Sequence, residues 1–318
     1  GDQDDYYGKA LKLSYDGTTL IIGSSKDDKQ GYVRVYEYAA SAWNQKGSDI
    51  FGSASTGSEK GEWDNFGHSV AINYDGTKIA IGVPKFETPY NLAYNNSTYY
   101  LVGCVEMYEY DSTNSTWNNY GSYNPHDYNS TFFPDESYYK IFPKRIWQDM
   151  YTGATIDMNY DGTIIAASTP GYYQGSAVIV VQYDSTTSTW SHIHKYPDGI
   201  TNDASYTYNS GCSISLNKDG DRIAIGGNYV ENAFTHANTS EITTYQGELT
   251  VWKYVATDTW SKIGSTIYGD NYDEFGYSVS LNDDGTIVAA SACSTKQDSS
   301  NITIGSNTNG TVRLYENY

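Results

Sequence analysis

Cysteine, proline and methionine are all scarce in this sequence: its 318 residues include 3 Cys, 7 Pro and 3 Met. Three cysteines are too few for a small scaffold stapled by disulfides. Bases are also scarce, since 19 Lys and Arg face 38 Asp and Glu, and the net charge is −19. Such a surface repels nucleic acids and anionic membranes. We therefore expect neither as a partner.

Long apolar segments are missing as well. The longest apolar run is a few residues around 178–181, whereas a membrane-spanning helix needs about 18 or more. The first residues, GDQDDYY, have neither the basic nor the apolar region of a signal peptide. We expect that such a peptide was removed, because the features below are typical of a secreted protein.

Tyrosine and glycine are abundant, at 34 and 30 residues, which favours strands and turns over helices. Five segments repeat one pattern. Each starts with a glycine and an alternating strand, as in GHSVAIN from Gly67, and runs into a turn such as YDGT. Asp-Gly in this turn supplies the positive φ of a tight hairpin. The turn aspartates are Asp16, Asp75, Asp161, Asp219 and Asp284.

Two further strands and a fourth element complete each repeat. A short apolar strand such as KIAIG follows the turn, and a third strand opens on glycine, as in GYVRVYEY from Gly31. The fourth element is centred on a tryptophan in the first four repeats, at Trp43, Trp117, Trp190 and Trp260. The fifth repeat ends before it.

The repeat predicts an all-β protein, a five-bladed β-propeller of four-stranded antiparallel sheets with an incomplete last blade. A solenoid or a row of independent hairpin domains is the competing interpretation. We treat residues 1–318 as one domain, with blades at about 7–52, 64–121, 151–196, 207–269 and 273–318 and a long insertion at 121–150.

Two stretches resemble a known family. The strings DNFGHSVAINYDGTKIAIGVP at Asp64 and DEFGYSVSLNDDGTIVAASAC at Asp273 resemble the FG-GAP repeat, the blade unit of integrin α-chain propellers. Similar repeats occur in secreted proteins of microalgae and their large viruses. The resemblance implies a propeller with an extracellular adhesion or interaction role, and it implies no particular reaction.

Blades of the FG-GAP type often carry a calcium loop, in which oxygen ligands recur at every second residue. Asp157, Asn159 and Asp161 have this spacing and precede Gly162, but the later carboxylate position holds apolar residues. The other interpretation of the three residues is an ordinary hairpin turn. Calcium is the one metal for which the sequence offers a candidate site, and no other cofactor is expected.

The cysteines and a histidine pair are the remaining candidates for a bridge or metal. Cys212, Cys293 and Cys104 are expected at one end of their blades, and Cys212 and Cys293 lie in adjacent blades where a disulfide fits; buried thiols are the alternative. His192 and His194 are expected on an exposed edge strand. The sequence shows no catalytic motif, so we expect no enzyme and name no catalytic residue.

Acceptor motifs for N-linked glycans occur in predicted loops and turns, mainly in the long loops between second and third strands. They are Asn95, Asn96, Asn114, Asn129, Asn238, Asn301 and Asn309. With the acidic composition rich in Tyr, Ser, Thr and Asn and with the family resemblance, they indicate a secreted or cell-surface protein that carries N-linked glycans.

Two segments stand apart from the repeat. The insertion at 121–150 contains the bases Lys140, Lys144 and Arg145, and either carries function or packs over a blade edge. The last blade leaves an unpaired edge strand, which favours pairing with other chains. Either the chain continues beyond Tyr318, the blade has three strands, or a neighbouring molecule supplies the fourth.

Three functions remain open. The first is a structural glycoprotein that self-assembles into a surface fibre, hair or coat through its blade edges and loop face. Its motivation is the open edge and the many tyrosines, which are enriched at interfaces. The second is an adhesion module that binds carbohydrate or cell-surface proteins. The third, least favoured, is a propeller glycosidase with paired carboxylates.

Overall fold

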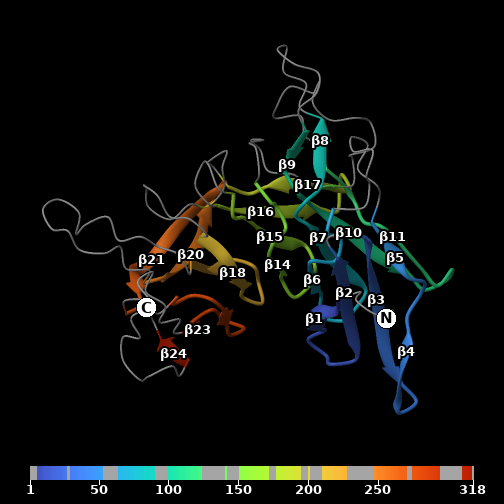
Figure 1. Ribbon diagram of the computed structural model, residues 1–318, viewed down its shortest axis with the longest axis horizontal. Helices are drawn as coiled ribbons and strands as arrows, with labels where there is room; N and C mark the ends of the chain where they lie inside the picture. Colours follow the sequence, from blue (N-terminus) through green and yellow to red (C-terminus); the bar gives the residue numbers. More distant parts are fainter. Residues whose placement is uncertain are drawn as a thin grey trace, which may run out of the picture.

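The sheets radiate from one central axis (Figure 1). The computed structural model describes residues 6–26, 29–52, 64–89, 99–123, 140–141, 150–171, 177–194, 200, 210–227, 246–270, 274–293 and 310–316. These residues form strands and turns and contain no helix, and hence none long and apolar enough to span a membrane. The predicted all-β, five-bladed propeller is confirmed.

The first three blades follow the predicted strand order. Blade 1 contains β1 (Tyr7–Leu13), β2 (Thr19–Lys26), β3 (Lys29–Ala39), β4 (Ala42–Gln45) and β5 (Ile50–Phe51). Blade 2 contains β6 (Ser69–Ile72), β7 (Lys78–Val83), β10 (Cys104–Asp111), β11 (Thr116–Asn119) and β13 (Lys140–Ile141). Blade 3 contains β14 (Ile156–Met158), β15 (Ile164–Thr169), β16 (Ala177–Asp184) and β17 (Thr189–His192), with β12 (Ser122–Tyr123) added in parallel to β17.

The last two blades differ in their outer strand. Blade 4 contains β18 (Ser210–Leu216), β19 (Arg222–Gly227), β20 (Glu248–Ala256) and the long β21 (Thr259–Tyr268). Blade 5 contains β22 (Val279–Leu281), β23 (Ile287–Ala292) and β24 (Thr311–Glu316). A separate hairpin of β8 (Glu87–Pro89) and β9 (Tyr99–Leu101) projects from blade 2. Among the described residues, blade 5 therefore has three strands.

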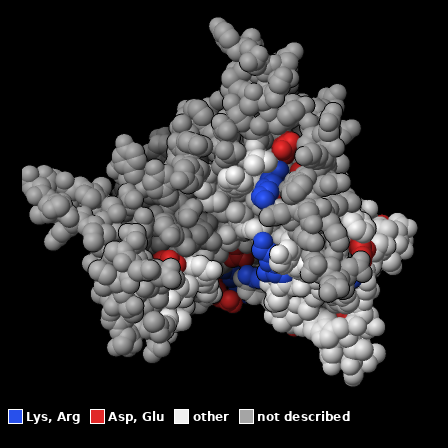
Figure 2. Space-filling model, viewed as in Figure 1, with Lys and Arg blue, Asp and Glu red and all other residues white. Residues whose placement is uncertain are grey.

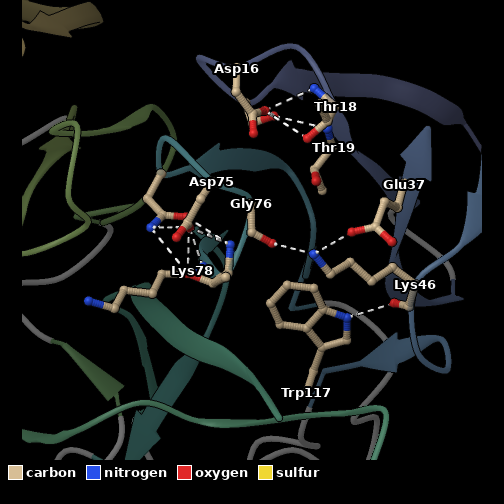
Figure 3. Close-up of polar contacts among 12 residues, drawn as sticks. Asp16, Thr18, Thr19, Glu37, Lys46, Asp75, Gly76, Lys78 and Trp117 are labelled. Carbon is tan, nitrogen blue, oxygen red and sulfur yellow. Dashed lines mark hydrogen bonds and ion pairs between the residues drawn. The ribbon is translucent and has the colours of Figure 1, made fainter. Parts of the chain in front are cut away.

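The turn between the first and second strand of each blade is held by its own side chains. In blade 2, Asn73 Oδ1 accepts the amides of Thr77 and Lys78, and Asp75 Oδ1 accepts the amide and hydroxyl of Thr77. Gly76 follows with φ of +66°, as the Asp-Gly pattern requires. Hydrogen bonds from Ser14 and Thr18 play the same part around Asp16 in blade 1 (Figure 3).

Successive blades pack face to face. We call the side of a blade toward the next blade along the chain its front face, and the opposite side its back face. Third-strand side chains of a front face meet first- and second-strand side chains of the next back face, as Val178 and Val180 meet Ile214 and Leu216. This burial of apolar surface supplies most of the favourable free energy of folding.

The tryptophans of the fourth strand tie each blade to the one before it. The indole Nε1 of Trp117 donates to the Lys46 carbonyl of blade 1 at 2.8 Å (Figure 3). Trp190 donates in the same way to Tyr120, and Trp260 donates to Ile193. The tryptophan that marks the repeat in the sequence is thus a contact between blades.

Candidate functional site

Charged side chains bridge blades across the axis. Lys12 Nζ of blade 1 lies 3.2 Å from Asp157 Oδ1 of blade 3, and Asp157 Oδ2 accepts the Leu216 amide of blade 4 at 2.8 Å. The Asp157 carboxylate raises the pKa of Lys12. Three blades therefore meet at one carboxylate, which acts as a structural link between inner strands.

The five turns form a chain of backbone hydrogen bonds at one end of the axis. In each of the first four blades, the amide before or within the turn donates to a carbonyl of the next blade: Asp16 to Tyr74, Tyr74 to Tyr160, Tyr160 to Lys218, and Lys218 to Asp283. The rings of Tyr74 and Tyr160 stack at 4.4 Å, and Lys218 Nζ lies 4.3 Å from the Tyr160 ring centroid. Tyr15 packs edge-on to Tyr160 and, like Tyr74, stays exposed.

The three candidate calcium residues do not point to a common site. Asn159 and Asp161 lie together in the turn, where Asn159 Nδ2 donates to Asp161 Oδ1 at 2.8 Å and Asp161 Oδ1 accepts the Thr163 hydroxyl. Asp157 points instead to Lys12 and Leu216. Within the described residues, no group of three or more His, Cys, Asp or Glu side chains lies close enough to hold a metal. Calcium binding stays a prediction.

The cysteines and histidines are only partly described. Burial raises the pKa of the Cys104 thiol well above its usual value and also raises that of Cys293. Cys293 is a free thiol in the structure, and the Cys212 side chain lies outside the described residues. A disulfide between the two stays a prediction. His194 is buried and His192 is half-buried, which corrects the expectation of an exposed pair. The two rings are in contact, with His192 Nδ1 2.8 Å from His194 Nε2.

One glycan acceptor is described. Asn114 is exposed in the turn between β10 and β11, and its Nδ2 donates to Asp111. The other acceptors, Asn95, Asn96, Asn129, Asn238, Asn301 and Asn309, lie outside the described residues. Occupancy at all seven stays a prediction.

Part of the long insertion belongs to blade 2. Lys140 and Ile141 form β13, which pairs with the beginning of β10. Lys140 Nζ lies 3.0 Å from Glu106 Oε1 with both side chains buried, and the Tyr108 hydroxyl donates to Glu106. Its neighbours Lys144 and Arg145 lie outside the described residues. This buried ion pair had no signal in the sequence, because Lys140 and Glu106 are far apart and match no motif.

The front face of blade 5 is uncovered. Val312 and Leu314 pair with Ser291 and Ala289, the same register that places two third-strand residues on the front face of every blade. In the first four blades these residues are at most 3% exposed; they are Val33, Val35, Val105, Met107, Val178, Val180, Leu249 and Val251. In blade 5, Val312 is 70% exposed and Leu314 is 72% exposed. No further blade among the described residues covers them.

The opposite side of β24 is packed, so the exposure is confined to one face. The Tyr315 ring lies edge-on to Phe275 at 6.2 Å, and Arg313 lies over the same ring and pairs with Asp270. Within the described residues β24 pairs only with β23, which leaves its outer edge open. Blade 5 thus combines a bare apolar face with an open strand edge.

The uncovered face borders an indentation in the molecule. The first and last blades lie on either side of it in Figure 1. Figure 2 shows the outline indented between the corresponding lobes, with acidic and basic side chains gathered at the inner end.

Comparisons with known proteins find similar solved structures but no family. No family model matches the chain, and no curated protein matches its sequence. The hydrazine synthase of Kuenenia stuttgartiensis is similar over 88% of this chain and 60% of its own, with 12% identity and a TM-score of 0.47. The Dos1 propeller is similar over 88% and 52%, with 10% identity and a TM-score of 0.44. The periplasmic gluconolactonase of Pseudomonas aeruginosa is similar over 96% and 72%, with 13% identity and a TM-score of 0.47. The chain thus spans less than two thirds of the first two structures.

Proposed function

We propose that this protein is a structural β-propeller that self-assembles outside the cell, as a glycosylated subunit of a fibre, hair or coat. The observation that carries the proposal is the front face of blade 5, where Val312 and Leu314 are exposed at positions that four other blades bury. Apolar residues that are exposed where the repeat normally buries them mark a protein interface. No catalytic residue forms part of the proposal.

The FG-GAP-like motifs and the acceptor motifs support the extracellular setting. The exposed Asn114 lies in a turn at the outer part of blade 2, well placed to carry a glycan without disturbing a sheet. The uncovered face of blade 5 is formed instead by strands β23 and β24. Glycans on turns and an apolar face on a sheet fit a subunit that is solvated on most of its surface and associates through one part of it.

Sedimentation of the glycosylated protein over a range of concentrations tests the proposal. We expect the average mass to rise with concentration for the wild type and to stay at the monomer mass for V312D/L314D, because two carboxylates on the face oppose its burial. V255D is the matched control, since Val255 is 54% exposed in the hairpin end of blade 4. A wild type that stays monomeric at high concentration would disprove self-assembly.

A binding role is the second candidate, favoured by the tyrosines at the axis. Tyr15 and Tyr74 are both exposed beside the Tyr160 ring and Lys218 Nζ, so aromatic faces and a cation lie together at one end of the propeller. Such rings stack on the apolar faces of sugars. A glycan array would show bound glycans that Y15A/Y74A no longer retains; an array without hits would remove this candidate.

A further inference from the structure

The back face of blade 1 is uncovered in the same way as the front face of blade 5. Leu11 and Leu13 lie opposite Ile22 and Leu20, the register of a first strand that packs on a preceding blade. The equivalent residues of blades 2 to 4 are 7% exposed or less; they are Val70, Ile72, Ile156, Met158, Ile214 and Leu216. Leu11 is 64% exposed and Leu13 is 47% exposed. Blade 1 therefore has a back face of the same apolar pattern, which no described residue covers.

Trp43 shows the same lack of a neighbour. Trp117, Trp190 and Trp260 each donate their indole N–H to the preceding blade. Trp43 pairs with Tyr38 as its counterparts pair with their own tyrosines, but it is 45% exposed and its indole N–H has no acceptor among the described residues. Blade 1 thus carries the tryptophan that in blades 2 to 4 donates to the preceding blade, and on blade 1 this tryptophan is exposed.

Two glycines give independent evidence for the same gap. The opening glycines Gly67, Gly153 and Gly276 lie against backbone atoms of the preceding blade, whereas nothing lies within 4 Å of a Cβ placed on Gly8. At the other end, Gly310 approaches only Ala292 of its own blade. Blades 1 and 5 of one molecule therefore do not cover each other's faces.

We propose that the front face of blade 5 binds the back face of blade 1 in a second copy of this chain, so that copies add head to tail. This inference rests on the self-assembly proposed above and names its two surfaces. Its basis is continuity with the internal contacts, because each of the four blade junctions already joins a front face to a back face of this pattern. The junction between copies is a fifth contact of the same kind.

Head-to-tail contact has a different outcome from a two-fold dimer. The two surfaces differ, so each copy keeps one free face of each kind after binding, and growth continues into a ring or an open helical filament. A two-fold contact between two blade 5 faces would instead stop at a dimer. The symmetry of the contact is therefore open to a direct test.

Complementation between two single-face variants is that test. L11D/L13D blocks the back face of blade 1, and V312D/L314D blocks the front face of blade 5. We expect each variant alone to be monomeric, and an equimolar mixture to form a 1:1 dimer and nothing larger. In the mixture, the unchanged front face of L11D/L13D binds the unchanged back face of V312D/L314D, and the two faces left over are both blocked. Sedimentation or light scattering measures the masses, and circular dichroism confirms that each variant is folded.

The outcomes separate the two proposals. If L11D/L13D alone still dimerises, the contact is between two blade 5 faces, so head-to-tail addition is wrong while self-assembly stands. If the variants stay apart in the mixture while the wild type assembles, head-to-tail addition is again wrong. If the wild type is monomeric, both proposals fail. Should L11D/L13D misfold, W43D replaces it, with an expected loss in affinity of at least about tenfold and V255D as control.

Discussion

Gly76 and Gly17 occupy the same place in the turns of blades 2 and 1, and both have positive φ, at +66° and +72°. Their surroundings differ. A Cβ on Gly76 would collide with the side chain of Thr19 in blade 1, whereas a Cβ on Gly17 would only touch Leu13 of its own blade at 4.0 Å. At the scale of residues, the cost of a side chain at a turn glycine therefore depends on the backbone of the turn and on whether a preceding blade packs against it.

Alanine at the two glycines separates these effects. We expect G17A to lower the free energy of unfolding by about 1 kcal/mol, the penalty for positive φ. G76A should lower it by about 1–3 kcal/mol more, because Thr19 must move to make room. Urea unfolding of the two variants measures the difference. Equal losses would contradict the tight contact between blades at this turn.

Several residue contacts could be predicted from the sequence and others could not. The Asp-Gly pattern predicts the positive φ of Gly76, because that requirement is local. The contact of Lys12 with Asp157 depends on the register of two first strands on opposite sides of the axis. No local pattern records that register, so Asp157 reads in the sequence as a calcium candidate.

At the scale of elements, the fourth strand is divided into two short strands in blades 1 and 2. β4 and β5 both pair with β3, and β11 and β13 both pair with β10. The tryptophan-centred first half is evident in the sequence. The second half is not, because Ile50–Phe51 and Lys140–Ile141 are too short to show alternation. Residues 140–141 therefore read as part of an insertion.

The indole hydrogen bond between blades gives a prediction for this element. W117F removes the donor to the Lys46 carbonyl, and we expect it to lower the free energy of unfolding by about 1 kcal/mol beyond the loss from W43F. Trp43 is the matched control because it has no acceptor among the described residues. Thermal melts followed by far-UV circular dichroism, at protein concentrations too low for self-association, compare the two. A larger loss for W43F would argue against the contact.

At the scale of the whole molecule, an apolar interface must form between strongly acidic copies. The net charge of −19 repels a second copy, and salt screens this repulsion, with a Debye length of about 10 Å at 0.1 M and about 3 Å at 1 M. We expect NaCl to tighten self-association. Sedimentation at several salt concentrations measures this effect; weaker association in high salt would point to ion pairs at the interface instead.

The uncovered faces mark the limit of prediction for the whole molecule. The third strands of blades 1 and 5 read almost alike, GYVRVY and GTVRLY, so the pattern predicts an apolar face in both. Val35 is buried and Leu314 is exposed because blade 2 follows blade 1 and no described blade follows blade 5. Exposure of a repeat's face depends on its neighbour, which the repeat itself does not encode.

The one-way order of the blade contacts also shapes how the chain folds as it is made. Each front face is covered only by the blade that follows it, as Val178 and Val180 of blade 3 are covered by Ile214 and Leu216 of blade 4. During synthesis from the N-terminus, each completed blade therefore presents one apolar face to the cell until its successor emerges. The exposed apolar face thus belongs to a different blade at each stage of synthesis but has the same pattern each time. A chaperone that binds this pattern could therefore bind the nascent chain at every stage.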